Sequence, residues 1–279
     1  MTPREFLRQA GPALRGDYAG ARPDFGVAQP GRYPESEHAL WRRLHARQMA
    51  LLPERADPDY LAHLADLDAA AGIPDFERTS ARLRRATGWE IVPVPGLIPD
   101  DAFFGHLARR RFPVTVWLCR PEEFDYIVEP DVFHDFLGHV PLLLEPDYAA
   151  YLQAYGEGGL KALRLGALPM LARLYWYTVE FGLIRTPGGL RAFGAGLLSS
   201  GAEVRHALES PAPRRIRFDL ERILRTEYRI DRFQDTYFVI DSFRDLVDAT
   251  LPDFTALYER VRAQPVLPPD AALPSDLPC

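Results

Sequence analysis

The feature that most constrains the fold of this chain is a close pair of histidines, His134 and His139, inside the apolar run 133–141. The chain contains 7 histidines, and no other two lie so near each other in the sequence. An imidazole is costly to bury without a polar partner, and it is a good ligand for Zn, Fe, Cu or Ni. A fold that buries this run must therefore supply hydrogen-bond partners for both rings, or a metal ion that they share.

Glu180 is the candidate third ligand, because it is the only acid in the aromatic and β-branched run 174–182. A buried carboxylate costs several kcal/mol unless it is paired with a cation or bound to a metal. Two histidines and one carboxylate make the facial triad of non-haem Fe(II) oxygenases, which leaves other coordination positions open. These residues therefore indicate a mixed imidazole and carboxylate metal site.

Spacing alone leaves a purely structural interpretation open. Backbone carbonyls can satisfy two core histidines, and Glu180 can pair with Arg173 or Arg185. On a regular α-helix, a separation of five residues leaves two side chains about 140° apart around the axis. A shared metal therefore requires long side chains, or a local widening of the helix near Gly138, to close this gap.

A Zn-dependent hydrolase is the alternative from a different class of enzyme. Zincins space their two histidines by four residues and carry a glutamate directly after the first. Here the spacing is five, and Asp135 follows His134. Both differences disfavour the hydrolase without excluding it.

Length and composition predict a globular protein of the cytoplasm. The 279 residues are enough for one large domain, and 47% hydrophobic with 26% charged residues is typical of such proteins. The net charge of −6 argues against nucleic acid or an anionic membrane as a partner, and no apolar run approaches the roughly 20 residues that span a bilayer. Cys119 and Cys279 are too few for a disulfide framework, and the N-terminus lacks the apolar core of a signal peptide, which together predict a reducing compartment.

The hydrophobic pattern predicts a mainly α-helical fold, a single domain of many helices with a few short strands. Residues 1–33 are expected to form a loosely structured arm, 34–263 the catalytic domain, and 264–279 an extended Pro-rich tail. Helices are expected near 34–52, 57–71, 74–87, 103–107 and 131–139, two or three within 146–182, and others near 218–228 and 243–261. Strands are expected at 89–92, 113–118 and 235–240, with a Gly-rich loop or weak strand at 190–200.

In two of these helices, individual residues predict where the helix begins or breaks. Asp57 is expected to cap a helix that begins at Pro58, since aspartate accepts bonds from free N–H groups and proline suits the first turn. Gly156, Gly158 and Gly159 are expected to break the first helix of residues 146–182, because glycine is a poor helix former.

Three segments in order, 129–143, 175–183 and 194–200, carry a resemblance to a known family. Over about residues 89–240 the sequence resembles the catalytic domain of the pterin-dependent aromatic amino acid hydroxylases, and most closely their compact bacterial members. The resemblance implies Fe(II) held by His134, His139 and Glu180, with tetrahydrobiopterin or a related tetrahydropterin as cofactor. It implies 4-hydroxylation of L-phenylalanine to L-tyrosine with O₂. Tryptophan or tyrosine as the substrate stays open, because the family shares these motifs.

The resemblance also implies a pterin site. Gly96, Leu97 and Ile98 match the backbone segment that hydrogen-bonds the pterin, and Phe103 matches the aromatic residue that stacks on it. Asp135 stands where the family carries an acid linked to the pterin through water. Plain core packing is the alternative for Phe103.

For the substrate, Arg120 matches the arginine that pairs with the amino acid carboxylate, a task that suits the forked guanidinium. Trp176 and Phe181 match residues that line the pocket for the aromatic ring. Gly196 and Ser199 match the loop around the substrate, where Ser199 is expected to hydrogen-bond a ligand histidine. The alternatives are a surface arginine, core aromatics and an ordinary turn.

A monomer is expected, because no long heptad-rich helix follows Val261. The family's regulatory domain is also expected to be missing, since only about 90 residues precede the resembling region. L-Phenylalanine and O₂ are the expected partners.

Overall fold

The computed structural model describes residues 1–3, 5–6, 14–124 and 129–279 of the chain. It is mainly helical with a few short strands, as the sequence predicts. Within the described residues, no helix combines the length and the apolar character needed to cross a membrane. The α-helices are α2 (Glu35–Leu51), α3 (Pro58–Asp66), α4 (Phe76–Ala86), α5 (Asp100–Leu107), α6 (Pro146–Arg164), α7 (Leu168–Tyr175), α8 (Ala195–Ser199), α9 (Glu203–Glu209), α10 (Leu220–Arg225), α11 (Phe243–Thr250) and α12 (Thr255–Arg262).

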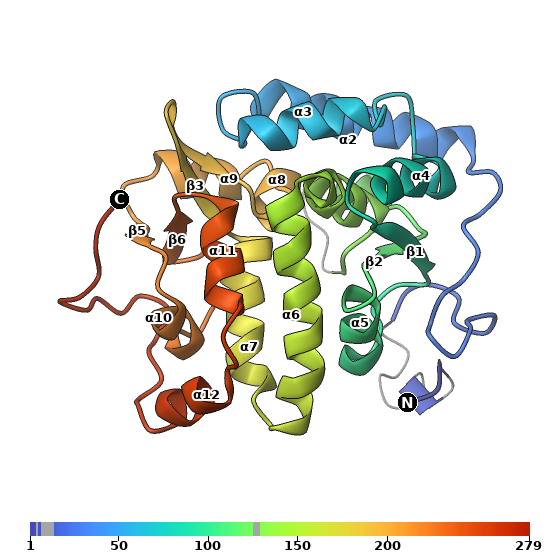
Figure 1. Ribbon diagram of the computed structural model, residues 1–279. Helices are drawn as coiled ribbons and strands as arrows, with labels where there is room; N and C mark the ends of the chain where they lie inside the picture. Colours follow the sequence, from blue (N-terminus) through green and yellow to red (C-terminus); the bar gives the residue numbers. More distant parts are fainter. Residues whose placement is uncertain (4, 7–13, 125–128) are drawn as a thin grey trace.

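Helix α6 runs through the centre of the molecule, with α7 and α11 on one side and α5 on the other (Figure 1). Helices α2 and α3 lie across one end of this group (Figure 1). The core is continuous, and its largest fully buried side chains include Trp41, Trp89, Tyr151 and Tyr177. The elements therefore form one body around α6.

Two small sheets lie on opposite sides of α6 (Figure 1). In the first, β1 (Glu90–Val94) pairs in parallel with β2 (Arg111–Thr115). The second has the order β4-β3-β6-β5, formed by β3 (Leu183–Thr186), β4 (Gly189–Ala192), β5 (Arg214–Arg217) and β6 (Thr236–Ile240). Every residue of β6 is buried, which agrees with its position between two parallel neighbours.

The start of α3 follows directly from its sequence. The Asp57 side chain accepts a hydrogen bond from the backbone N–H of Tyr60 at 3.3 Å, and Pro58 occupies the first turn. The predicted cap is confirmed. The strand expected at 113–118 instead runs from Arg111 to Thr115, since its pairing with β1 fixes its limits.

The predicted break in the first helix of residues 146–182 is wrong, because α6 continues unbroken from Pro146 to Arg164. Two of its glycines face α5. A Cβ at Gly156 would lie 2.5 Å from the backbone nitrogen of Ala108, and one at Gly159 would lie 2.0 Å from Cδ1 of Phe104. Close packing of two helices therefore explains these glycines better than helix propensity does.

The segment expected as a Gly-rich loop or weak strand, 190–200, divides into strand β4 and the short helix α8. Strands β3 and β5 and helix α9 have no counterpart among the expected elements. Each is seven residues or shorter, and such segments give too few repeats for a helical or strand period to stand out.

The two ends of the chain lie against the helical body. Described residues 14–34 form no helix or strand, but the N–H of Val27 donates to the carbonyl of Pro93 at 2.8 Å. Residues 264–279 also lack helices, and Asp276 forms an ion pair with Arg222 at 2.9 Å that is almost wholly buried. Residues 4 and 7–13 of the expected arm lie outside the described residues. The domain limits at 33/34 and 263/264 stay predictions.

The packing of α5 against α6 makes Gly159 and Gly158 a matched pair for mutation. Gly159→Ala should lower the free energy of unfolding by about 1–3 kcal/mol, because the new methyl overlaps Phe104. Gly158→Ala should raise it by about 0.5–1 kcal/mol, because no atom lies within 4 Å of its Cβ position and alanine favours the helix. Urea denaturation of both variants measures the difference. Equal effects would contradict the packing explanation.

Candidate active site

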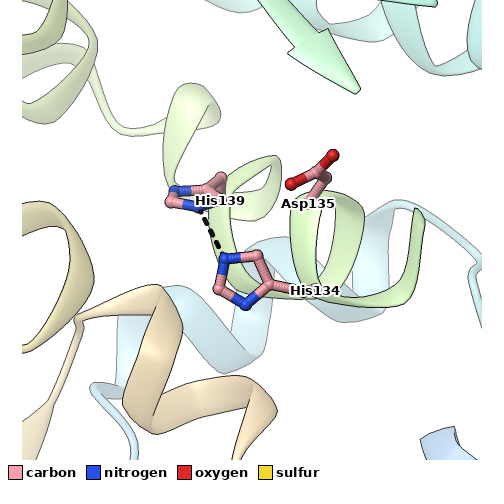
Figure 2. A group of neighbouring side chains, drawn as sticks. All are labelled: His134, Asp135 and His139. Atoms are coloured by element: carbon pink, nitrogen blue, oxygen red, sulfur yellow. Dashed lines mark hydrogen bonds between the residues drawn. The ribbon is translucent and has the colours of Figure 1, made fainter. Parts of the chain in front are cut away.

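The two histidines lie on one face of a widened helical turn. Residues His134–His139 form the π-helix η3, in which residues five apart are hydrogen-bonded neighbours. Their side chains therefore face the same way, and the two Nε2 atoms lie 3.3 Å apart (Figure 2). Of the two expected ways to bring the rings together, the chain uses the local widening of the helix. Helix α8 packs on this turn so closely that a Cβ at Gly138 would lie 2.8 Å from the Cβ of Ala195.

A second π-helix, η5 (Trp176–Glu180), follows α7 and brings the Glu180 carboxylate to the same point. Its Oε1 lies 3.3 Å from Nε2 of His139, and its Oε2 lies 3.6 Å from Nε2 of His134. Arg173 and Arg185, the arginines weighed as partners, instead bind a backbone carbonyl and a different carboxylate. The three predicted ligands therefore converge.

Asp135 is the other carboxylate near the two rings. Ligand atoms of His134, Asp135 and His139 all lie within 4.8 Å of one another. The Asp135 Oδ2, however, accepts a hydrogen bond from the backbone N–H of Thr115 at 2.8 Å. The Glu180 oxygens lie 3.3 and 3.6 Å from the two Nε2 atoms, so the geometry favours Glu180 over Asp135 as the third candidate ligand.

Ser199 determines which nitrogen of His134 carries the proton. The Ser199 hydroxyl donates to the carbonyl of Ala195 at 2.8 Å, so its bond of 2.9 Å with Nδ1 of His134 must be one that it accepts. Nδ1 therefore holds the proton, and Nε2 presents its lone pair to the Glu180 carboxylate. Two acceptors that face each other repel unless a cation lies between them. This arrangement fits a bound metal ion.

The charge states of these groups also suit metal binding. Burial lowers the pKa of His134 to about 4, so the ring is neutral near pH 7. Burial tends to raise the pKa of Glu180, but His139, His134 and the Tyr175 hydroxyl together bring it below its usual value. Neutral imidazole and ionised carboxylate are the forms that bind metals. Bonds of about 2.0–2.2 Å place neighbouring ligand atoms about 3 Å apart, close to the observed separations.

A cavity of about 260 Å³ opens on one side of the three ligands. We call it the Phe103 cavity. Its lining includes all five residues that the resemblance assigns to the pterin, together with the three ligands: Gly96, Leu97, Ile98, Phe103, Asp135, His134, His139 and Glu180. The chain thus brings together the predicted pterin residues beside the predicted metal ligands.

A second cavity, of about 340 Å³, also reaches His134. We call it the Trp176 cavity. Four of the five residues that the resemblance assigns to the substrate line it, namely Trp176, Phe181, Gly196 and Ser199. The ring centroids of Trp176 and Phe181 lie 4.9 Å apart. These two side chains therefore form one aromatic wall.

Arg120 is the fifth predicted substrate residue, and its side chain is exposed. Among the described residues it lines neither cavity. Its neighbours Cys119 and Glu123 do line the Trp176 cavity, and the backbone N–H of Arg120 donates to Glu123 at 2.8 Å. Arg120 therefore stands at the edge of this cavity, and its contact with a substrate stays a prediction.

One wall of the Trp176 cavity was not predicted from the sequence. This wall comes from α9 and from the segment before β6, and it consists of Glu203, Arg229, Ile230, Asp231, Arg232, Phe233 and Gln234. The only local signal is a pair of apolar residues, Ile230 and Phe233, within a charged run. That pattern is common in exposed loops, so it does not identify a site.

Comparison with known proteins gives consistent matches. The family model for biopterin-dependent aromatic amino acid hydroxylases matches residues 29–262. The phenylalanine-4-hydroxylase of Ralstonia nicotianae is 61% identical over 88% of this chain and 79% of its own length, and that of Chromobacterium violaceum is 58% identical over 91% and 86%. The crystal structure of C. violaceum phenylalanine hydroxylase bound to cobalt is 54% identical, with a TM-score of 0.91 over 98% of both chains. The structure of that enzyme with bound oxidized Fe(III) has a TM-score of 0.89 at 56% identity, over 92% of this chain and 94% of that chain.

The bond between Ser199 and His134 predicts a loss of metal affinity on mutation. Ser199→Ala should weaken Fe(II) or Co(II) binding by about 10–100-fold, because His134 loses the acceptor that orients its ring. Ser200→Ala is the matched control, since Ser200 lines the same cavity but bonds to Glu203. Titration of metal-free protein measures both affinities. Equal losses in the two variants would contradict the prediction.

Burial raises the pKa of Glu203 to about 7, and this predicts a pH-dependent stability. Between its unfolded pKa of about 4.3 and the folded value, the folded chain holds a proton that the unfolded chain has lost. Stability should therefore fall as the pH rises from about 5 to 7, by at most about 1.4 kcal/mol per pH unit, and level off above. The difference in unfolding free energy between wild type and Glu203→Gln isolates this contribution. A difference that is constant across this range would refute it.

Proposed function

The chain belongs to the family of biopterin-dependent aromatic amino acid hydroxylases, and we propose that it hydroxylates L-phenylalanine to L-tyrosine. It is a monooxygenase that uses O₂, Fe(II) and a reduced tetrahydropterin such as tetrahydrobiopterin. The observation that carries this proposal is the convergence of His134, His139 and Glu180 at a point reached by two cavities. One cavity suits the cofactor and the other suits the substrate.

His134, His139 and Glu180 would hold the iron by one face, which leaves positions open toward the cavities. Iron and reduced pterin together supply the activation of O₂, a chemistry that protein side chains do not provide. The chain keeps His134 neutral, holds its proton on Nδ1 through Ser199, and places the ligands in largely buried surroundings. These features give His134 its binding form before a metal arrives.

In the Phe103 cavity, the Phe103 ring would stack on the pterin, and the backbone of Gly96, Leu97 and Ile98 would hydrogen-bond its edge. Asp135 would contact the pterin through water. All five residues line this cavity within reach of the iron ligands. An aromatic face and convergent polar groups are the usual features of a site for a planar heterocycle.

In the Trp176 cavity, Trp176 and Phe181 would confine the substrate ring, with Gly196 and Ser199 on the loop around it. Arg120 would pair with the substrate carboxylate from the edge of the cavity. A ring held there lies beside His134 and hence beside the iron. The protein therefore contributes orientation and proximity more than chemistry.

The alternatives have less support. Tryptophan or tyrosine hydroxylation would use the same iron site, but the two curated relatives described above are named for phenylalanine. A Zn-dependent hydrolase needs an acid placed to activate water. Asp135, the acid after His134, instead bonds to the backbone of Thr115.

We also propose that the protein is a monomer in the cytoplasm. The segment after α12 packs against α10 of the same chain through the ion pair between Arg222 and Asp276. Both cysteines are free, with Cys119 buried, which suits a reducing compartment.

Product analysis tests the proposed reaction. Protein loaded with Fe(II) and supplied with a tetrahydropterin, O₂ and L-phenylalanine should yield L-tyrosine, whereas loading with Zn should yield none. The same assay with tryptophan and with tyrosine measures the preference. No tyrosine from phenylalanine, or faster hydroxylation of another amino acid, would overturn the assignment.

A further inference from the structure

Gln234 lies just before β6, in the wall of the Trp176 cavity, and it is only 2% exposed. Its Oε1 accepts hydrogen bonds from the indole N–H of Trp176 at 3.0 Å and from the backbone N–H of Arg229 at 3.1 Å. Its Nε2 donates to the carbonyl of Arg229 at 2.8 Å. An indole nitrogen can only donate, so the oxygen of the amide must face Trp176. The orientation of this side chain is therefore fixed.

The backbone of Gln234 is anchored as firmly as its side chain. Its N–H donates to Oε1 of Glu203 at 3.1 Å, and the Tyr237 hydroxyl donates to the same oxygen at 3.0 Å. Its carbonyl lies 3.3 Å from Nε2 of His206. Because Glu203 and His206 both belong to α9, the backbone of Gln234 is held by a helix that is far from η5 in the sequence.

Trp176 depends on this amide for its exact placement along the cavity wall. Its ring stacks on Tyr228, with centroids 4.3 Å apart and planes 16° apart, and it also contacts Phe181. Stacking holds the plane of an indole but allows sliding within that plane. The hydrogen bond to Gln234 fixes the edge of the ring and removes that freedom.

The side-chain amide of Gln234 also holds the two ends of the segment 229–233 close together. This amide bonds both the N–H and the carbonyl of Arg229. Ile230 and Phe233, which are 76% and 43% exposed, lie within it and line the Trp176 cavity. One side chain therefore fixes two walls of the cavity.

We propose that Gln234 is a positioning residue for the aromatic substrate, which sets the spacing between the Trp176 indole and the 229–233 segment. It touches neither the iron ligands nor the Phe103 cavity among the described residues. Its influence is therefore confined to the substrate side. The inference rests on the proposed function, because it takes the Trp176 cavity as the site of the substrate ring.

The test replaces Gln234 with methionine, which has a similar length and no hydrogen bonds. In the Fe(II)-loaded enzyme, Gln234→Met should raise the KM for phenylalanine about tenfold, because a misplaced wall weakens substrate binding. The KM for the tetrahydropterin should change less than about twofold. Less tyrosine should form for each tetrahydropterin oxidised, because the ring is held less accurately.

A double-mutant cycle separates positioning from general damage. In a Trp176→Phe background, Gln234→Met should have a clearly smaller effect on the KM for phenylalanine, because the shared hydrogen bond is already lost. Thr79→Val is the control for stability, since Thr79 is similarly buried and its hydroxyl donates to the backbone carbonyl of Asp75, just before α4. It should lower stability without a change in either KM.

Tryptophan fluorescence tests the position of Trp176 without any catalytic turnover, so its result does not depend on the proposed reaction. The difference in fluorescence between wild type and Trp176→Phe reports this indole among the 4 tryptophans of the chain. This difference should change in wavelength or intensity in the Gln234→Met series, because the indole N–H loses its hydrogen-bond acceptor. Equal rises in both KM values, equal effects in both backgrounds, or an unchanged fluorescence difference would each overturn the inference. A wild-type enzyme that makes no tyrosine would overturn the proposed function and leave the fluorescence result standing.

Discussion

The structure depends on the close approach of three largely buried side chains, the imidazoles of His134 and His139 and the carboxylate of Glu180. The two Nε2 atoms and the Glu180 oxygens lie 3.3–3.6 Å apart, and Ser199 holds the proton of His134 on the far side of its ring. Burial keeps that ring neutral. Burial of such groups without a metal is costly. This arrangement therefore lowers the free energy of unfolding of the metal-free protein.

Two local departures from the regular α-helix make this approach possible. The histidines and the glutamate both lie on π-helices, η3 and η5, which are rare and are frequent at functional sites. Each widened turn is held by its surroundings. Gly138 lets α8 pack against η3, and α8 in turn carries Ser199, which bonds to His134. The same contact therefore shapes the turn and orients the ligand.

The sequence predicted much of the fold and the nucleus of the site, because both leave local signals. Asp57 and Pro58 mark a helix start through their own side chains. The paired histidines indicate a candidate metal site, because they lie close together in an apolar run. The glycines of α6 led to a wrong prediction of a helix break. Close packing of α6 against α5 stabilises the helix by more than the low helix propensity of Gly156 and Gly159 destabilises it. Local propensity does not record which helix faces a glycine.

The sequence by itself determined the candidate ligands, the residue types around them and the mainly helical class, since these follow from composition, spacing and motif. Only the tertiary structure decided that two cavities meet at His134. It also decided that Gln234, 58 residues after Trp176, holds the indole, and that Glu203, 27 residues after Trp176, holds Gln234. These contacts join segments that no local hydrophobic pattern in the sequence connects. They depend on how α9 and β6 pack against η5, and chain geometry over that distance is set by the whole core.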